Sequence, residues 1–129
     1  MNHAVRLIAA AAAWPAALSA QSSPAPLTAE AMWELKRVGA PAISPDGKLA
    51  VYEVKHYDVE NDKGEADLFM VPTTGGKPRR LTSSKGNESE PAWSPDGRWI
   101  AFVAKRGDDK QPQLYVISAT GGEAIRVTD

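Results

Sequence analysis

The residues of this chain best suited to chemistry lie between positions 56 and 67, where one histidine precedes a run of carboxylates. Asp58, Glu60 and Asp62 alternate, which suggests a calcium site because Ca²⁺ prefers carboxylate oxygens as ligands. The EF-hand pattern fails, because it requires a glycine directly after Asp62, where Lys63 stands, and a final glutamate where Phe69 stands. These residues therefore do not predict an EF-hand.

The same carboxylates, together with Glu65 and Asp67, fit a solvated β-hairpin better. We expect its turn at Asn61 to Gly64, since asparagine and glycine favour turns. His56 lies beside this hairpin, and no serine and carboxylate stand at a triad spacing from it. We expect a structural role for His56.

Other catalytic and cofactor motifs are missing from these 129 residues. There is no Gly-x-Ser-x-Gly elbow, no cysteine and no paired histidine. The pairs Gly75-Gly76 and Gly121-Gly122 read as turns, because no helix with a lysine follows them as in a phosphate-binding loop. The sequence therefore predicts no catalytic, cofactor-binding or metal-ligating residue, and no cofactor.

A four-residue phrase occurs twice and organises the rest of the chain. Ser44-Pro45-Asp46-Gly47 returns 50 positions later as Ser94-Pro95-Asp96-Gly97. Proline presets φ for the first central position of a turn, aspartate suits the second, and glycine accepts the left-handed conformation that follows. Each phrase is typical of a turn that closes a hairpin with a bulge, and we expect positive φ at both glycines.

The residues after each phrase also match, at an offset of 46 positions. Leu68–Val71 corresponds to Leu114–Ile117, and the two Gly-Gly turns and the strand ends at Leu81 and Val127 follow the same offset. A unit of about 45 residues with four antiparallel strands has the size of a propeller blade. The apolar runs at 49–52 and 99–104 barely alternate, which indicates strands covered on both faces.

The sequence predicts an all-β fold: two four-stranded blades of an incomplete β-propeller, preceded by a signal peptide and one short helix. We divide the chain into a signal peptide at 1–20, a linker and lead-in helix at 21–38, a first blade at 39–82, and a linker and second blade at 83–129, truncated before further blades.

The leader combines Arg6, the apolar run Leu7–Ala17 and the small residues Ser19-Ala20. An N-terminal anchor or a buried helix is the alternative. Because of this leader, we expect a periplasmic or secreted protein. No later segment is long and apolar enough to cross a membrane, so we expect no stable membrane insertion after the leader is cleaved.

The lead-in helix has recognisable ends. Thr28 is a good N-cap, Lys36 and Arg37 would fall in the last turn, and Gly39 would stop the helix. The predicted length is about ten residues. One face of this helix would carry Leu27, Ala31, Leu35 and Val38.

The aromatic residues and the net charge limit which binding partners are possible. Trp93, Trp99, Phe102 and Tyr115 occupy strand positions of the second unit. They could form a carbohydrate or peptide platform, but packing between neighbouring blades is the favoured interpretation. A formal net charge of −1 gives no support for nucleic-acid binding.

The phrases Ala92–Gly97, Ile100–Phe102 and Leu114–Val116, followed by Gly121-Gly122, resemble the WD40-like, or TolB-like, propeller repeat. That resemblance covers about 39–129. Residues 27–39, with Pro41 and the first Ser-Pro-Asp-Gly, resemble the start of exported serine peptidases of the prolyl oligopeptidase family (S9), including acylaminoacyl-peptidase-like and dipeptidyl-peptidase-like members.

This resemblance implies a serine-type peptidase that hydrolyses short peptides. Its Ser-Asp-His triad would lie in an α/β-hydrolase domain after the propeller, which would cap the active site. The remaining blades and the hydrolase domain would then be partners in cis, and the peptide substrate would bind the full-length protein. The alternative is a non-enzymatic TolB-like periplasmic binding propeller. TolB carries an α/β domain ahead of its propeller, and the residues before Gly39 leave no room for one.

The leader gives a first testable prediction. Expressed in a bacterium with a similar export system, the chain should lose about twenty residues and appear outside the cytoplasm, because its short apolar core and small residues fit a signal-peptidase site. Intact-mass spectrometry of the exported material would show a new N-terminus near Gln21. Exported chains that still begin at Met1 would contradict cleavage.

Overall fold

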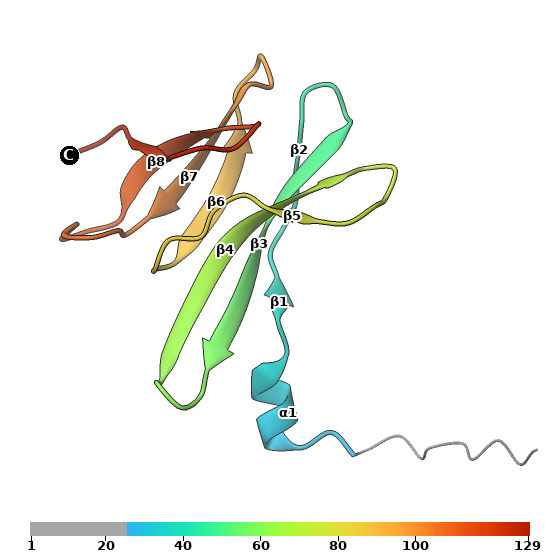
Figure 1. Ribbon diagram of the computed structural model, residues 1–129, viewed down its shortest axis with the longest axis vertical. Helices are drawn as coiled ribbons and strands as arrows, with labels where there is room; N and C mark the ends of the chain where they lie inside the picture. Colours follow the sequence, from blue (N-terminus) through green and yellow to red (C-terminus); the bar gives the residue numbers. More distant parts are fainter. Residues whose placement is uncertain (1–25) are drawn as a thin grey trace, which may run out of the picture.

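The computed structural model describes residues 26–129, and these fold into two antiparallel β-sheets with one short helix (Figure 1). The all-β prediction with two blade-like units is confirmed. The predicted signal peptide and most of the linker after it lie outside the described residues. In the described part of the chain, no helix is long and apolar enough to span a membrane.

The first sheet contains β1 (Arg37–Val38), β2 (Ala42–Ile43), β3 (Leu49–Asp58), β4 (Lys63–Pro72) and β5 (Arg79–Arg80). The strand order is β1-β3-β4-β5, and β2 also pairs with β3. β1 and β2 therefore follow one another along the same edge of β3. The predicted blade gains β1 as an extra short strand.

The second sheet is a simple meander of β6 (Glu88–Trp93), β7 (Trp99–Ala104), β8 (Gln113–Ser118) and β9 (Ile125–Arg126). Every neighbouring pair is antiparallel. The pairing of β6 with β7 shifts register between Ser89 and Ala92. The four strands match the predicted second blade.

The two repeated turns have the expected backbone. Gly47 has φ of 74° and Gly97 has φ of 69°. In each turn the glycine N–H donates to the carbonyl of the serine three residues earlier, at 2.8 Å for Ser44 and 2.9 Å for Ser94. The prediction of positive φ at both glycines is confirmed.

The serine and aspartate side chains add a contact that the turn rules alone did not predict. Ser44 Oγ donates to Asp46 Oδ1 at 2.6 Å and accepts from the backbone N–H of Leu49 at 2.9 Å. Asp46 Oδ1 also accepts from the N–H of Lys48 at 3.1 Å. The hydrogen bond from Ser44, then that from Lys48, holds the pKa of Asp46 below its usual value. The second turn repeats all three contacts.

The lead-in helix is shorter than predicted. Thr28 is the N-cap, accepting the N–H of Ala31 at 3.2 Å, but α1 covers only Ala29–Glu34. Leu35 already has an extended backbone (ψ of 124°). The prediction that Lys36 and Arg37 form the last helical turn is wrong. Residues 37 and 38 pair with β3 instead, because an open strand edge offers backbone hydrogen bonds that a fraying helix end lacks.

The helix also packs differently from its predicted face. Leu27, Leu35 and Val38 are 67%, 57% and 67% exposed. Trp33 makes the contact instead, with its ring 5.2 Å from that of Tyr57 on β3. A single aromatic pair therefore anchors α1 to the long β3–β4 hairpin, which projects alongside it in Figure 1.

The tip of that hairpin lies two residues earlier than predicted. The strands pair as far as Asp58 and Lys63, so the turn is residues 59–62 and not 61–64. Asp58 fixes this position because its carboxylate accepts the N–H groups of Glu60 and Asn61 at 3.0 and 3.1 Å. Asp62 adopts a φ of 51°, which aspartate tolerates better than most residues.

The core lies between the two sheets. From the first sheet it takes Val51, Leu68 and Met70, and from the second Ile100 and Phe102, among others. The expectation that these strands are covered on both faces holds for β3, where the neighbouring residues Ala50 and Val51 are both buried, but it is wrong for β7. In β7 the even-numbered residues are buried, while Trp99 is exposed and Ala101 and Val103 are half-buried. β7 thus buries only the face that meets the first sheet.

Gly47 gives the cleanest test of the repeated turn, because a Cβ built there meets no atom within 4 Å. Replacing Gly47 by valine should lower the free energy of unfolding by about 1–2 kcal/mol, through backbone strain alone. Gly47→Asn is the matched variant and should cost less, since asparagine tolerates this region. Urea unfolding measures both. Equal losses would show that φ is not the cause.

Candidate functional site

His56 lies where the sequence suggested, on the β3–β4 hairpin. Its Nε2 is 3.6 Å from Oε2 of Glu65, its cross-strand partner, and both side chains are about two-fifths exposed. Among the described residues, no serine or threonine hydroxyl bonds to it. This geometry gives a surface ion pair when the histidine is protonated, and it does not give a nucleophile and base.

Several carboxylates of the hairpin each have a separate hydrogen-bond or ion-pair partner. Asp58 caps the turn, Asp62 accepts from the hydroxyl of Tyr57, and Asp67 pairs with Arg80 at 2.7 Å. The hydrogen bond to Asp62 also raises the pKa of the Tyr57 hydroxyl. Within residues 26–129, no three His, Cys, Asp or Glu side chains gather as a metal site would require. Asp58 and Asp62 therefore stabilise the tip of the hairpin, and Asp67 stabilises its sheet.

The charged groups with the deepest burial lie elsewhere, and the sequence reasoning missed them. Glu88, at the start of β6, has a fully buried side chain paired with Arg106, which is 17% exposed. Ser84 Oγ donates to Glu88 Oε1 at 2.5 Å. The guanidinium of Arg106 lies over the rings of Phe102 and Tyr115, at 5.1 and 5.0 Å. The pair therefore joins the connection between the sheets to the core of the second sheet.

A second buried carboxylate extends this cluster. Asp109 accepts the hydroxyl of Tyr115 at 2.6 Å, the N–H of Arg106 at 3.1 Å, and Nη1 of Arg126 at 2.9 Å. These donors, with Tyr115 first, hold the pKa of Asp109 below its usual value. A carboxyl with a lowered folded-state pKa stabilises the fold above its unfolded-state pKa, and acidification through the folded pKa removes that contribution.

Two atoms of the cluster have no hydrogen-bond partner, namely Glu88 Oε2 and Arg106 Nε. A carboxylate and a guanidinium that face each other neutralise one another, so neither is poised to transfer a proton. The visible signal in the sequence was a glutamate at the start of an otherwise half-apolar strand. That signal does not reveal its partner, which stands 18 positions later.

Two further contacts tie the sheets together. Trp93 Nε1 donates to the carbonyl of Ala42 at 2.9 Å, and Trp93 packs against the core. Arg79 donates from Nη2 to the carbonyl of Ala119 at 2.8 Å and from Nη1 to that of Thr120 at 3.3 Å.

The interpretation that Trp93 packs between neighbouring blades is confirmed. Phe102 and Tyr115 belong to the same core, whereas Trp99 is 41% exposed on the opposite face.

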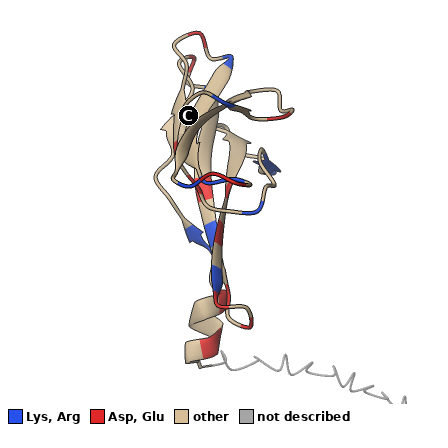
Figure 2. Cartoon of the chain, turned by 90° about the vertical axis from the view of Figure 1, so that its left-hand side faces the viewer, with Lys and Arg blue, Asp and Glu red and all other residues tan. Residues whose placement is uncertain are grey.

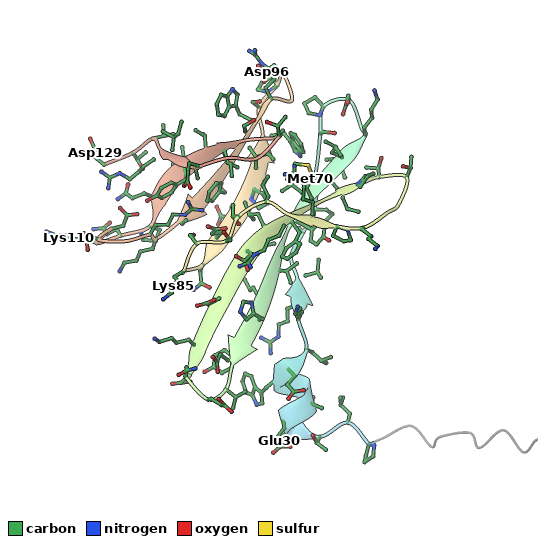
Figure 3. All side chains as sticks on the ribbon, viewed as in Figure 1. Glu30, Met70, Lys85, Asp96, Lys110 and Asp129 are labelled. Carbon is green, nitrogen blue, oxygen red and sulfur yellow. The ribbon has the colours of Figure 1, made fainter. Side chains whose placement is uncertain are left out.

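Charge is spread over the described chain. Figure 2 shows basic and acidic residues interspersed along both sheets in that view. Figure 3 places Asp96 at one end of the second sheet and Lys110 at the other, with Met70 where the two sheets meet. A cavity of about 250 Å³ lies beside the buried cluster, lined by residues that include Ser84, Arg106 and Glu123. The residues that line this cavity form no catalytic constellation.

The buried pair predicts a large effect of one substitution. Glu88→Ala should lower the free energy of unfolding by about 3–5 kcal/mol, because it leaves Arg106 without its partner in a mostly buried place. Glu88→Gln keeps an oxygen for Ser84 and should cost less. The exposed Glu65→Ala is the control and should cost at most about 1 kcal/mol. Equal losses for Glu88→Ala and Glu65→Ala in urea unfolding would contradict this assignment.

Comparison with curated proteins finds relatives named as peptidases. Dipeptidyl-peptidase 5 of Porphyromonas gingivalis is 42% identical over 85 residues, which is 66% of this chain and 12% of that protein. The uncharacterised peptidase YuxL of Bacillus subtilis is 34% identical over 103 residues, 80% of this chain and 16% of that protein. The chain therefore spans less than a fifth of the length of either relative.

Solved structures share the fold. A TolB from Agrobacterium tumefaciens is 29% identical with a TM-score of 0.57, over 74% of this chain and 31% of that one. An acylaminoacyl peptidase from Pyrococcus horikoshii is 22% identical with a TM-score of 0.60, over 75% of this chain and 14% of that one. Residues 31–129 also match the family described as the TolB beta propeller domain. With its two four-stranded sheets and repeated turns, the chain belongs to the TolB β-propeller domain family.

Proposed function

We propose that the chain is the propeller part of an exported serine-type peptidase that hydrolyses short peptides. The observation that carries this proposal is the 42% identity to a dipeptidyl-peptidase 5 over two thirds of the chain. The peptidase YuxL supports it over a longer stretch. The residues ahead of the first repeated turn, which resemble the start of such peptidases, point the same way.

We assign the catalytic groups to another domain because the buried carboxylates and the histidine of the described residues already have partners. Three buried carboxylates pair with arginines, the buried Glu53 pairs with Lys55, and the histidine pairs with a surface glutamate. The nucleophile, base and oxyanion donors would therefore lie in an α/β-hydrolase domain of the full-length protein. The propeller would cover that active site and admit only short peptides.

The outer faces of the two sheets support further blades in cis. Leu68 is fully buried against the second sheet, whereas Leu114, its counterpart in the repeat, is 37% exposed. Val51 is likewise fully buried, and its counterpart Ala101 is half-buried. A propeller closes when each blade covers the face of its neighbour. We propose that further blades of the full-length protein follow the second sheet.

A TolB-like binding propeller is the second candidate. The 29% identity to the Agrobacterium TolB favours it, and this function would need no hydrolase domain. Both candidates share the proposed export to the periplasm or the outside of the cell, since the N-terminal residues resemble a signal peptide. Neither candidate involves nucleic acid, in keeping with a net charge of −1.

The test uses the protein encoded by the whole gene. The peptidase proposal predicts that this protein cleaves short chromogenic peptides and reacts covalently with a fluorophosphonate, because the reagent labels an activated serine. Mass spectrometry should map the label to a Gly-x-Ser-x-Gly serine beyond Asp129. The 129-residue chain, treated identically, is the control and should show neither turnover nor label.

Two outcomes would favour the binding propeller instead. One is a gene that ends after the last blade, and the other is a full-length protein that neither cleaves peptides nor takes up the label. Labelling of a serine within residues 26–129 would contradict both candidates.

A further inference from the structure

Each repeated turn contains an aspartate followed directly by a glycine, and no other Asp-Gly or Asn-Gly pair occurs in the 129 residues. Such a pair is prone to isomerise, because glycine has no side chain to hinder attack of its backbone nitrogen on the preceding carboxyl group. The turn nevertheless requires the glycine, since Gly47 and Gly97 have φ of 74° and 69°. We propose that the serine of each turn protects the Asp-Gly bond of that turn from isomerisation.

The reaction to be prevented is a loss and regain of water. The nitrogen of Gly47 attacks Cγ of Asp46 and loses its proton, an N–Cγ bond forms, and the hydroxyl of the carboxyl group leaves as water. The cyclic succinimide then takes up water at either carbonyl, which restores aspartate or leaves isoaspartate with an additional methylene in the backbone. The carboxyl group must be neutral to react, because an ionised one would have to expel an oxide ion in place of water.

In the first turn, hydrogen bonds hold the carboxyl group in its ionised form. Oδ1 of Asp46 accepts from Oγ of Ser44 at 2.6 Å and from the N–H of Lys48 at 3.1 Å. These bonds favour the carboxylate and lower the pKa of Asp46, with the bond from Ser44 as the largest cause. Ser44 is buried, and its Oγ accepts the N–H of Leu49 at 2.9 Å. The serine is therefore a fixed donor to an exposed carboxylate.

The attacking nitrogen also has a partner. The N–H of Gly47 donates to the carbonyl of Ser44 at 2.8 Å. For the reaction to occur, Gly47 must give up this bond, and the carboxyl group of Asp46 must leave its donors and take up a proton. Each of these steps costs free energy. The folded turn should therefore isomerise more slowly than the same residues in an unfolded chain.

The second turn repeats these contacts. Oδ1 of Asp96 accepts from Oγ of Ser94 at 2.6 Å and from the N–H of Arg98 at 3.0 Å. The N–H of Gly97 donates to the carbonyl of Ser94 at 2.9 Å. The bond from Ser94 is again the largest cause of the lowered pKa of the aspartate. The basic side chains differ, because Nε of Arg98 is 2.6 Å from Asp96 whereas Nζ of Lys48 is 3.9 Å from its aspartate. The protection is therefore assigned to the serine, which both turns share.

Isomerisation of one turn would disturb its surroundings. The additional methylene would break the bond from Gly47 to Ser44, and it would displace the Gly47 carbonyl, which accepts the hydroxyl of Thr73 at 2.8 Å. The two turns also lie against each other, because a Cβ built on Gly97 would be 3.7 Å from Cδ of Pro45. Protection of the turns thus preserves a contact between neighbouring blades. This inference depends on the turns alone and does not rest on the proposed peptidase activity.

The test follows both Asp-Gly bonds of the protein encoded by the whole gene. The protein is kept in heavy-oxygen water at about pH 5, roughly one unit above the usual pKa of aspartate. Every passage through the succinimide adds one heavy oxygen, which mass spectrometry of peptides locates, and chromatography separates isoaspartate. Ser44→Ala should accelerate exchange at residue 46 on the order of tenfold, because a hydrogen bond to a charged group is lost. Residue 96 should be unaffected, and Ser94→Ala should give the reverse result.

Two further variants separate the contact with the carboxylate from a general loosening of the turn. Thr73→Ala removes the bond to the Gly47 carbonyl but leaves every partner of Asp46 in place, so exchange should stay at the wild-type rate. Ser44→Thr retains a hydroxyl and should retain most of the protection. In Ser44→Ala, the rate should also begin to fall at a higher pH than in wild type, because loss of the donor raises the pKa of Asp46 and keeps the reactive neutral form to a higher pH.

Four results would overturn the proposal. The first is equal rates in the folded protein and in concentrated urea, and the second is an unchanged rate at residue 46 in Ser44→Ala. The third is an equal acceleration in Thr73→Ala, which would make loosening of the turn the cause. The fourth is acceleration at both turns by either serine variant, which would show that the effect is not local to one turn.

Discussion

The packing of one sheet face against the other is the contact on which the rest of this structure depends. Phe102, Ile100 and Ile117 of the second sheet are almost fully buried against Val51 and Leu68 of the first. Burying such side chains contributes roughly 1.5–3 kcal/mol each. Strands as short as the two-residue β5 and β9 add little by themselves. The repeated turns, the buried ion pairs and Arg79, which bridges the two sheets, all lie around this one apolar contact.

Much of the fold could be predicted because the same pattern of turn and strand residues occurs in both units of the sequence. Pro45 and Gly47 dictate a turn by their backbone preferences, and the same turn recurs at Pro95 and Gly97. The errors occur where one local rule competed with a contact from a distant residue. The residues of the lead-in after Glu34 favour a helix by their type, but residues 37 and 38 pair with the edge of β3 as a strand.

The candidate site was less predictable because its central residues pair across long stretches of chain. Glu88 and Arg106 are ordinary charged residues until the fold buries them together with Ser84. No spacing rule links a residue on a strand with a residue that lies 18 positions later in a loop. The sequence did identify His56 and the hairpin carboxylates, whose partners are near neighbours in the chain or across one hairpin, although it placed the turn two residues too late.

The central claim is that the two sheets are neighbouring blades that share one core and depend on each other for stability. Hydrogen exchange of the Phe102→Ala variant tests it most directly, because Phe102 belongs to the second sheet and packs on the first. The account predicts faster amide exchange in β3 and β4 as well as in β7 and β8, since removing a buried phenylalanine destabilises the shared core by about 3–5 kcal/mol. Faster exchange confined to the second sheet, with β3 and β4 unchanged, would contradict it.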